Sequence, residues 1–186
     1  MILTDESGRM HFDFTAFCQS GLCSAEHFDI AENKCDGLKL VDFIAENDKW
    51  HVFIEAKNYA NTSGSPKIQA NMNKRQKTDY RMLTDPDAAF PLETGMVFKD
   101  SLFRWLASGK KFVKPIVLLL VINPPQGLMS RERERLTKRI EGYIPSGMNN
   151  KLDKYKNMEN IFFAMLTLDD LKDAKNSYGF TVSLTL

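Results

Sequence analysis

Apolar runs separated by short polar turns divide the chain into predicted strands. Two of these runs flank the polar turn 46–49 and predict a β-hairpin. A longer run without polar alternation, KPIVLLLVIN, predicts a strand that is buried on both faces at the centre of a sheet. The predicted strands span residues 27–32, 38–45, 50–59, 114–123, 161–168 and 180–186.

Apolar side chains recur at helical spacing in the intervening segments. The predicted helices span residues 13–23, with Asp13 as cap, 66–84, 95–108 and 130–143. In the last two helices the expected inner faces carry Phe98, Leu102, Trp105 and Leu106, and then Leu136, Ile140 and Tyr143. The pattern predicts a single α/β domain over residues 1–186, with its core at about 13–168 and helices flanking a mixed central β-sheet.

Composition narrows the class of protein without deciding the function. The chain has 186 residues, of which 43% are hydrophobic and 26% charged, as in ordinary globular domains. A formal net charge of +1 argues against a protein that coats DNA by charge alone. It leaves room for a nucleic-acid enzyme, because acidic metal ligands offset a basic groove.

The cysteines and the N-terminus bear on localisation. Cys18, Cys23 and Cys35 show no CxxC spacing, which favours reduced thiols in a cytoplasmic protein and argues against a zinc site. The first ten residues carry no signal-peptide pattern. The apolar run 116–122 is too short to cross a bilayer, so no membrane association is expected.

Three charged residues in the predicted hairpin are candidates for a metal-binding or catalytic site. Glu55 and Lys57 are two residues apart on one strand and therefore share a face, and the hairpin turn brings Asp42 beside Glu55. Charges among apolar neighbours need partners or a metal, and two carboxylates suit Mg²⁺ or Mn²⁺. The plainer interpretation is a strand salt bridge of Glu55 with Lys57 or Lys39, with Asp42 in a turn network.

The stretch LVDFIAENDKWHVFIEAKNY, residues 40–59, resembles the PD-(D/E)xK nuclease superfamily. Val41 stands where the family name has proline. The resemblance implies a restriction-endonuclease-like αβββαβ core, in which Asp42 and Glu55 bind Mg²⁺ or Mn²⁺ and Lys57 assists the attacking water. The implied reaction is hydrolysis of DNA phosphodiester bonds.

Residues 67–81 add two weaker features to this interpretation. Gln76 and Tyr80 have the QxxxY spacing of RecB-like nucleases, although either is also an ordinary residue of a polar helix. Basic residues there would contact a DNA backbone, or else form a solvated helix face: Lys67, Lys74, Arg75, Lys77 and Arg81. Glu26 is the candidate for a further metal-binding acid, with a solvated strand residue as the alternative.

The sequence therefore predicts a metal-dependent deoxyribonuclease, an endonuclease in a defence or repair system whose targeting comes from a partner protein. A homodimer is compatible with it. One alternative is a catalytically inactive nuclease-fold subunit that binds nucleic acid or protein. Another is a ribonuclease, or a protein-interaction subunit that uses the helix at 130–143.

Overall fold

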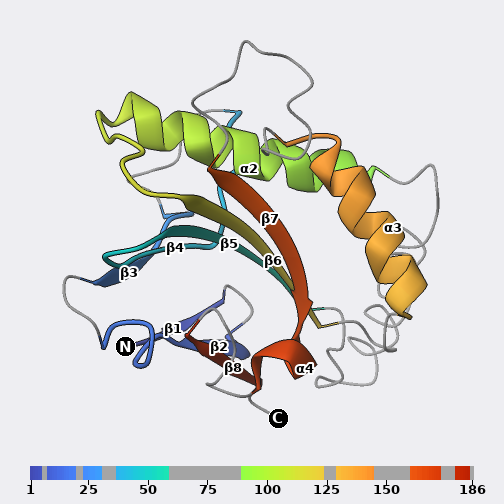
Figure 1. Cartoon of the computed structure of the whole chain (residues 1–186), viewed down its shortest axis with the longest axis horizontal. Coiled ribbons are helices and arrows are strands. Elements are labelled where there is room, and N and C mark those ends of the chain that lie inside the picture. The colour runs from blue at the N-terminus through green and yellow to red at the C-terminus, as the bar shows by residue number, and fades with distance from the viewer. Residues whose placement is uncertain are drawn as a thin grey trace.

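The computed structural model describes residues 1–5, 8–19, 23–30, 37–58, 89–123, 129–144, 160–172 and 179–184. These residues form a five-stranded sheet, a three-stranded sheet and helices (Figure 1). The helix expected at 66–84 lies outside the described residues. The fold of the described part is mixed α/β, as the sequence predicts.

The larger sheet has the order β3-β4-β5-β6-β7. Its strands are β3 (Ser24–His27), β4 (Phe43–Glu46), β5 (His51–Asn58), β6 (Ile116–Asn123) and β7 (Ile161–Thr167). The first three strands pair antiparallel and the last three pair parallel, which confirms the mixed sheet and the hairpin. Parallel neighbours need long connections, and these contain α2 (Phe90–Ala107) and α3 (Ser130–Glu141).

The hairpin begins later than the apolar pattern predicts, because residues before β4 are bonded to a helix. The backbone N–H of Lys39 donates to Asp100 Oδ2, and that of Val41 donates to Ser101 Oγ, both at 2.9 Å. Both acceptors belong to α2. The N–H groups of these two residues therefore bond to helix side chains rather than to a neighbouring strand, and β4 begins only at Phe43.

The predicted helix at 13–23 is wrong for the described residues. Instead β1 (Ile2–Thr4), β2 (Met10–Asp13) and β8 (Thr181–Leu184) form a second, antiparallel sheet. The Asp13 carboxylate accepts hydrogen bonds from the backbone N–H and hydroxyl of Thr15, at 2.9 and 2.6 Å, and so stabilises a turn in place of a helix. Phe14 and Phe17 are buried from this turn.

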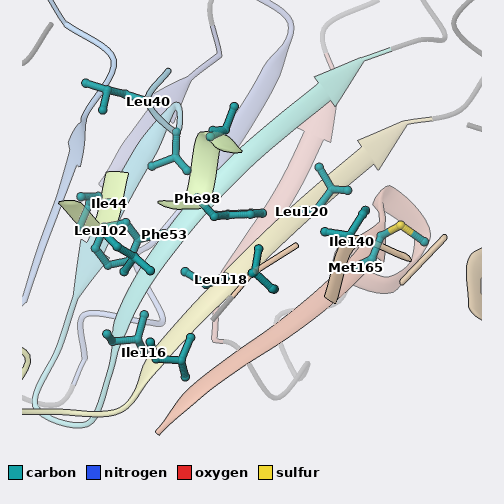
Figure 2. Packing of buried hydrophobic residues seen from close by; sticks show 14 of the residues in the cluster. Leu40, Ile44, Phe53, Phe98, Leu102, Ile116, Leu118, Leu120, Ile140 and Met165 are labelled. Atoms are coloured by element: carbon teal, nitrogen blue, oxygen red, sulfur yellow. The ribbon is translucent and has the colours of Figure 1, made fainter. Parts of the chain in front are cut away.

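One hydrophobic core lies between the larger sheet and the two helices. Figure 2 shows Phe53, Leu118 and Leu120 of the strands facing Phe98 and other helix residues. Of the predicted inner residues, Leu102, Trp105, Leu136 and Ile140 join this core. Each fully buried side chain of this kind contributes roughly 1.5–3 kcal/mol.

Two predicted core residues are exposed instead. Leu106 has an exposed fraction of 49%, because it points to the outer face of α2. Tyr143 is 41% exposed, because α3 ends at Glu141 and the helical period does not reach it. A Cβ added at Gly95 would lie 2.5 Å from Tyr143 Cβ, so a glycine is needed where α2 meets this segment.

A second core lies between the two sheets. It takes the alternate side chains of the central strands, including Val52, Ile54, Val117 and Leu119, with Phe12 of the smaller sheet. The seven residues of β6 from Ile116 to Ile122 are buried, which confirms the prediction that this strand is covered on both faces.

The prediction of reduced thiols is wrong for two of the three cysteines. Cys18 and Cys23 form a disulfide with a Cα–Cα distance of 5.1 Å. The five-residue separation gave no motif that would have identified the pair. Cys35 lies outside the described residues. Among the described helices, none is long and apolar enough to cross a membrane.

Candidate active site

Strand register places Asp42 next to β5. Phe43 lies opposite Ile54, so one further step along the register places Asp42 opposite Glu55. The Asp42 side chain accepts a hydrogen bond from the backbone N–H of Ala56 at 2.7 Å, and its carbonyl oxygen accepts one from Phe28 at 2.9 Å. Asp42 therefore lies between β3 and β5, at a bend one residue before β4.

Glu55 and Lys57 lie on the helix-covered face of β5. Alternation along the strand places them on the side of Phe53, whose ring belongs to the helix-side core. Glu55 is only 3% exposed, while the side chain of Lys57 is 39% exposed. The Lys57 ammonium is paired with Glu55 Oε1. The structure thus brings together the three residues that the hairpin pattern singled out.

Burial dominates the electrostatics of Glu55. It raises the pKa of this carboxyl from 4.5 to about 7, against the opposing effect of Lys57. The negative charges of Asp42 and Asp29 contribute to the same rise. A desolvated carboxyl beside other acids has a high pKa because ionisation would add negative charge to an already negative site. Strongly perturbed groups of this kind are enriched at functional sites.

Asp29 was missed in the sequence. It lies two residues after β3, next to Phe28, whose backbone is bonded to Asp42. Asp29 comes close to Glu55 only because β3 pairs with β4 in this register. The apolar pattern predicts this strand at 27–32 and gives no register for it.

Glu26, the acid proposed instead, is not brought to this cluster. It lies opposite Ile44, in a different cross-strand row from Asp42. Its side chain is 55% exposed and pairs with Lys110 at 3.8 Å. This arrangement matches the alternative of a solvated strand residue.

The other predicted site residues lie outside the described part of the chain. They are Lys67, Lys74, Arg75, Gln76, Lys77, Tyr80 and Arg81. Their roles remain predictions from the sequence.

The described residues contain no group of three or more His, Cys, Asp or Glu side chains arranged to hold a metal ion. A two-carboxylate site is a different case, because Mg²⁺ commonly takes one or two protein carboxylates and keeps several water ligands. The oxygens of Asp42 and Glu55 are the hard ligands that such an ion prefers. The burial of Glu55 beside other acids fits a group whose charge a cation would neutralise.

Comparison with family models, with curated proteins and with solved structures finds no match to this chain.

Proposed function

We propose that the chain is a metal-dependent nuclease that hydrolyses phosphodiester bonds of DNA, with a restriction-endonuclease-like fold. The observation that carries the proposal is the buried Glu55, whose pKa is raised to about 7 beside Asp42, Asp29 and Lys57. The resemblance of residues 40–59 to the PD-(D/E)xK superfamily assigns Asp42, Glu55 and Lys57 to catalysis.

Each residue has a distinct role in this proposal. Asp42 and Glu55 hold Mg²⁺ or Mn²⁺, and Asp29 adds negative charge that favours a cation. When bound, the ion supplies Lewis-acid stabilisation of the phosphate and a more acidic water. Lys57, partly exposed at the edge of the buried site, orients the attacking water and stabilises the charge that develops on the phosphate oxygens.

The substrate assignment depends on the sequence rather than on the described residues. The basic residues at 67–81 support contacts to a nucleic-acid backbone, and the resemblance favours DNA. It also predicts a place in a defence or repair system, with a partner subunit that supplies targeting.

The Lys57–Glu55 ion pair favours a second candidate, an inactive nuclease-fold subunit. In that case the lysine would satisfy the buried acid permanently, and the pair would be structural. The proximity of Asp42 and Asp29 argues for the first candidate, because carboxylates close to Glu55 supply the oxygen ligands and negative charge that attract a cation.

A cleavage assay tests the proposal. Wild-type protein is incubated with supercoiled plasmid, linear duplex, single-stranded DNA and RNA, in Mg²⁺, Mn²⁺ or EDTA. We expect metal-dependent cleavage of DNA that EDTA abolishes. Lys57→Ala and Asp42→Asn should each reduce the rate by about 100-fold or more, by analogy with the loss of a single transition-state contact.

Two controls make the assay decisive. Circular dichroism checks that each variant keeps its fold, and Lys49→Ala is the matched change at an exposed lysine in the hairpin turn. Equal cutting by wild type and Lys57→Ala would indicate a contaminating nuclease and reject the assignment. Absence of cutting on every substrate would support the inactive subunit.

A further inference from the structure

The outer face of α2 carries a continuous row of exposed apolar side chains. Leu92, Met96, Phe103 and Leu106 are exposed to 43%, 40%, 61% and 49%. Their spacing places them, with Lys99, on one side of the helix, within about a quarter of a turn around its axis. We call these five residues the outer stripe. Single exposed apolar residues are ordinary, but four along one helix face are typical of an interaction surface.

In the part of the chain that the structure describes, the hydrophobic cores do not include this stripe. The opposite side of α2 supplies Val97, Phe98, Leu102 and Trp105 to the core against the larger sheet. Figure 1 shows α2 along one side of the larger sheet. The helix therefore packs one apolar face against the sheet and carries a second apolar face that points away from it.

The stripe has an approximate two-fold symmetry in its sequence. Leu92 and Leu106 lie seven residues before and after Lys99, and Met96 and Phe103 lie three before and four after it. Two copies of α2 packed antiparallel about Lys99 would place Leu92 against Leu106 of the second copy. The same arrangement places Met96 against Phe103. Such self-complementarity is what a two-fold interface between identical chains requires.

Charges on one flank of the stripe agree with the antiparallel direction. Glu93 lies six residues before Lys99 and Arg104 five residues after it, on the same side of the helix. Antiparallel packing brings Glu93 near Arg104 of the second copy, and the symmetry repeats this pair. Parallel two-fold packing would place this flank of the two helices on opposite sides of the seam, where neither pair could form. Lys99 in the middle of the seam would weaken the contact but specify its alignment.

We propose that the outer stripe of α2 binds a second copy of this chain and forms an antiparallel, two-fold homodimer. The interface is independent of the proposed nuclease activity, because its residues point away from the sheet that carries Glu55. Its test is the oligomeric state alone, so failure of one proposal leaves the other standing.

Analytical ultracentrifugation of the full chain at about 100 µM, a concentration suited to a micromolar dissociation constant, provides the test. Wild type is expected to be dimeric and Phe103→Asp monomeric. Val113→Asp is the matched control, because Val113 is 74% exposed but lies beyond α2, off the stripe. This control should remain dimeric. Lys99→Leu should tighten the dimer by about tenfold or more, because it removes a charge from the seam.

A charge exchange tests the direction of packing without removing apolar surface. Glu93→Arg and Arg104→Glu should each weaken the dimer, and the double variant should restore it. A monomeric wild type would overturn the proposal, as would a dimer that Phe103→Asp leaves intact. Loss of the dimer in both Phe103→Asp and Val113→Asp would also count against the stripe, and failure of the double variant to restore it would reject the antiparallel pairing.

Discussion

The two ends of β5 bury ionisable side chains on the same face of the sheet, but their charges are balanced differently. At the start of the strand, His51 is 2% exposed and its Nδ1 lies 3.3 Å from Glu46 Oε2. Glu46 also accepts a hydrogen bond from Lys114 Nζ at 2.7 Å. Near the end of the strand, Glu55 is equally buried but has Asp42 and Asp29 as neighbours besides Lys57.

The directions of the pKa shifts express this difference. Burial lowers the pKa of His51, so its ring is neutral at neutral pH and Lys114 is left to balance Glu46. Burial opposes the ionisation of Glu46, but the hydrogen bond from Lys114 and nearby positive charges outweigh it, and its pKa is lowered. Glu55 has a raised pKa. A strongly raised carboxyl pKa of this kind is typical of functional sites, so the Glu55 end is the candidate site.

The largest expected effect is on activity. Glu55→Gln should reduce DNA cleavage by about 100-fold or more, because the amide is a poor metal ligand. His51→Phe, at the other end of the strand, should cleave at the wild-type rate, because phenylalanine keeps the edge-on contact with Trp105. The measurement is the initial rate on plasmid in Mg²⁺. Similar losses in both variants would mean that the assay reports on folding rather than on the site.

The next effect is on stability, which the same Glu55→Gln substitution should increase although it lowers activity. Folded Glu55 retains its proton between pH 4.5 and about 7 while the unfolded chain has released it, so the free energy of unfolding falls as pH rises through this window. The shift corresponds to about 3 kcal/mol. Glu55→Gln should therefore be more stable than wild type at pH 8 without metal, by up to this amount, and gain almost nothing at pH 4.

Urea denaturation with EDTA at both pH values measures this gain. A destabilised Glu55→Gln at pH 8 would contradict the raised pKa of Glu55 in the folded protein. It would instead support a structural ion pair with Lys57.

A smaller effect is expected at the balanced end. The folded pKa of Glu46 is lowered, so its pair with Lys114 stabilises the protein above the unfolded pKa of about 4.5, and this contribution is lost as pH falls through the folded pKa. Glu46→Gln should cost about 1 kcal/mol at pH 7, as expected for a partly exposed pair. The cost should shrink as the pH falls below 4.5. If Glu46→Gln were more stable than wild type at pH 7, the two ends of β5 would not differ in how their charges are stabilised.

The smallest effect is expected for Glu26→Gln. This acid shares the helix-side face but lies in another cross-strand row, and it is exposed and paired with Lys110. Its replacement should change stability by less than about 0.5 kcal/mol, since exposed pairs contribute little. Cleavage should be unchanged. A loss of cleavage as large as that of Glu55→Gln would show that Glu26 belongs to the active site.

Local pattern was sufficient for the central strands and for the hairpin. The patterns at 114–123 and 50–59 predicted strands correctly because β5 and β6 each bury side chains on both faces over most of their length. Strand alternation and a short turn were also sufficient to place Asp42, Glu55 and Lys57 together.

Tertiary contacts decided what the pattern missed. The apolar spacing at 13–23 is also compatible with a turn, and the hydrogen bonds of Asp13 to Thr15 stabilise that turn. The conformation of the residues before β4 depends on hydrogen bonds to Asp100 and Ser101 of α2, which lie some sixty positions away in the sequence. The position of Asp29 near Glu55 and the pairing of Cys18 with Cys23 likewise depend on which strands and turns become neighbours.

Manganese binding tests the central claim most directly. Isothermal titration calorimetry of Mn²⁺ into wild type, Asp42→Asn, Glu55→Gln and His51→Phe compares the two ends of β5 in one experiment. We predict that wild type and His51→Phe bind with equal affinity, and that Asp42→Asn and Glu55→Gln each bind at least about tenfold more weakly. Absence of Mn²⁺ binding by wild type, or equal binding by all four proteins, would contradict a cation site at Glu55.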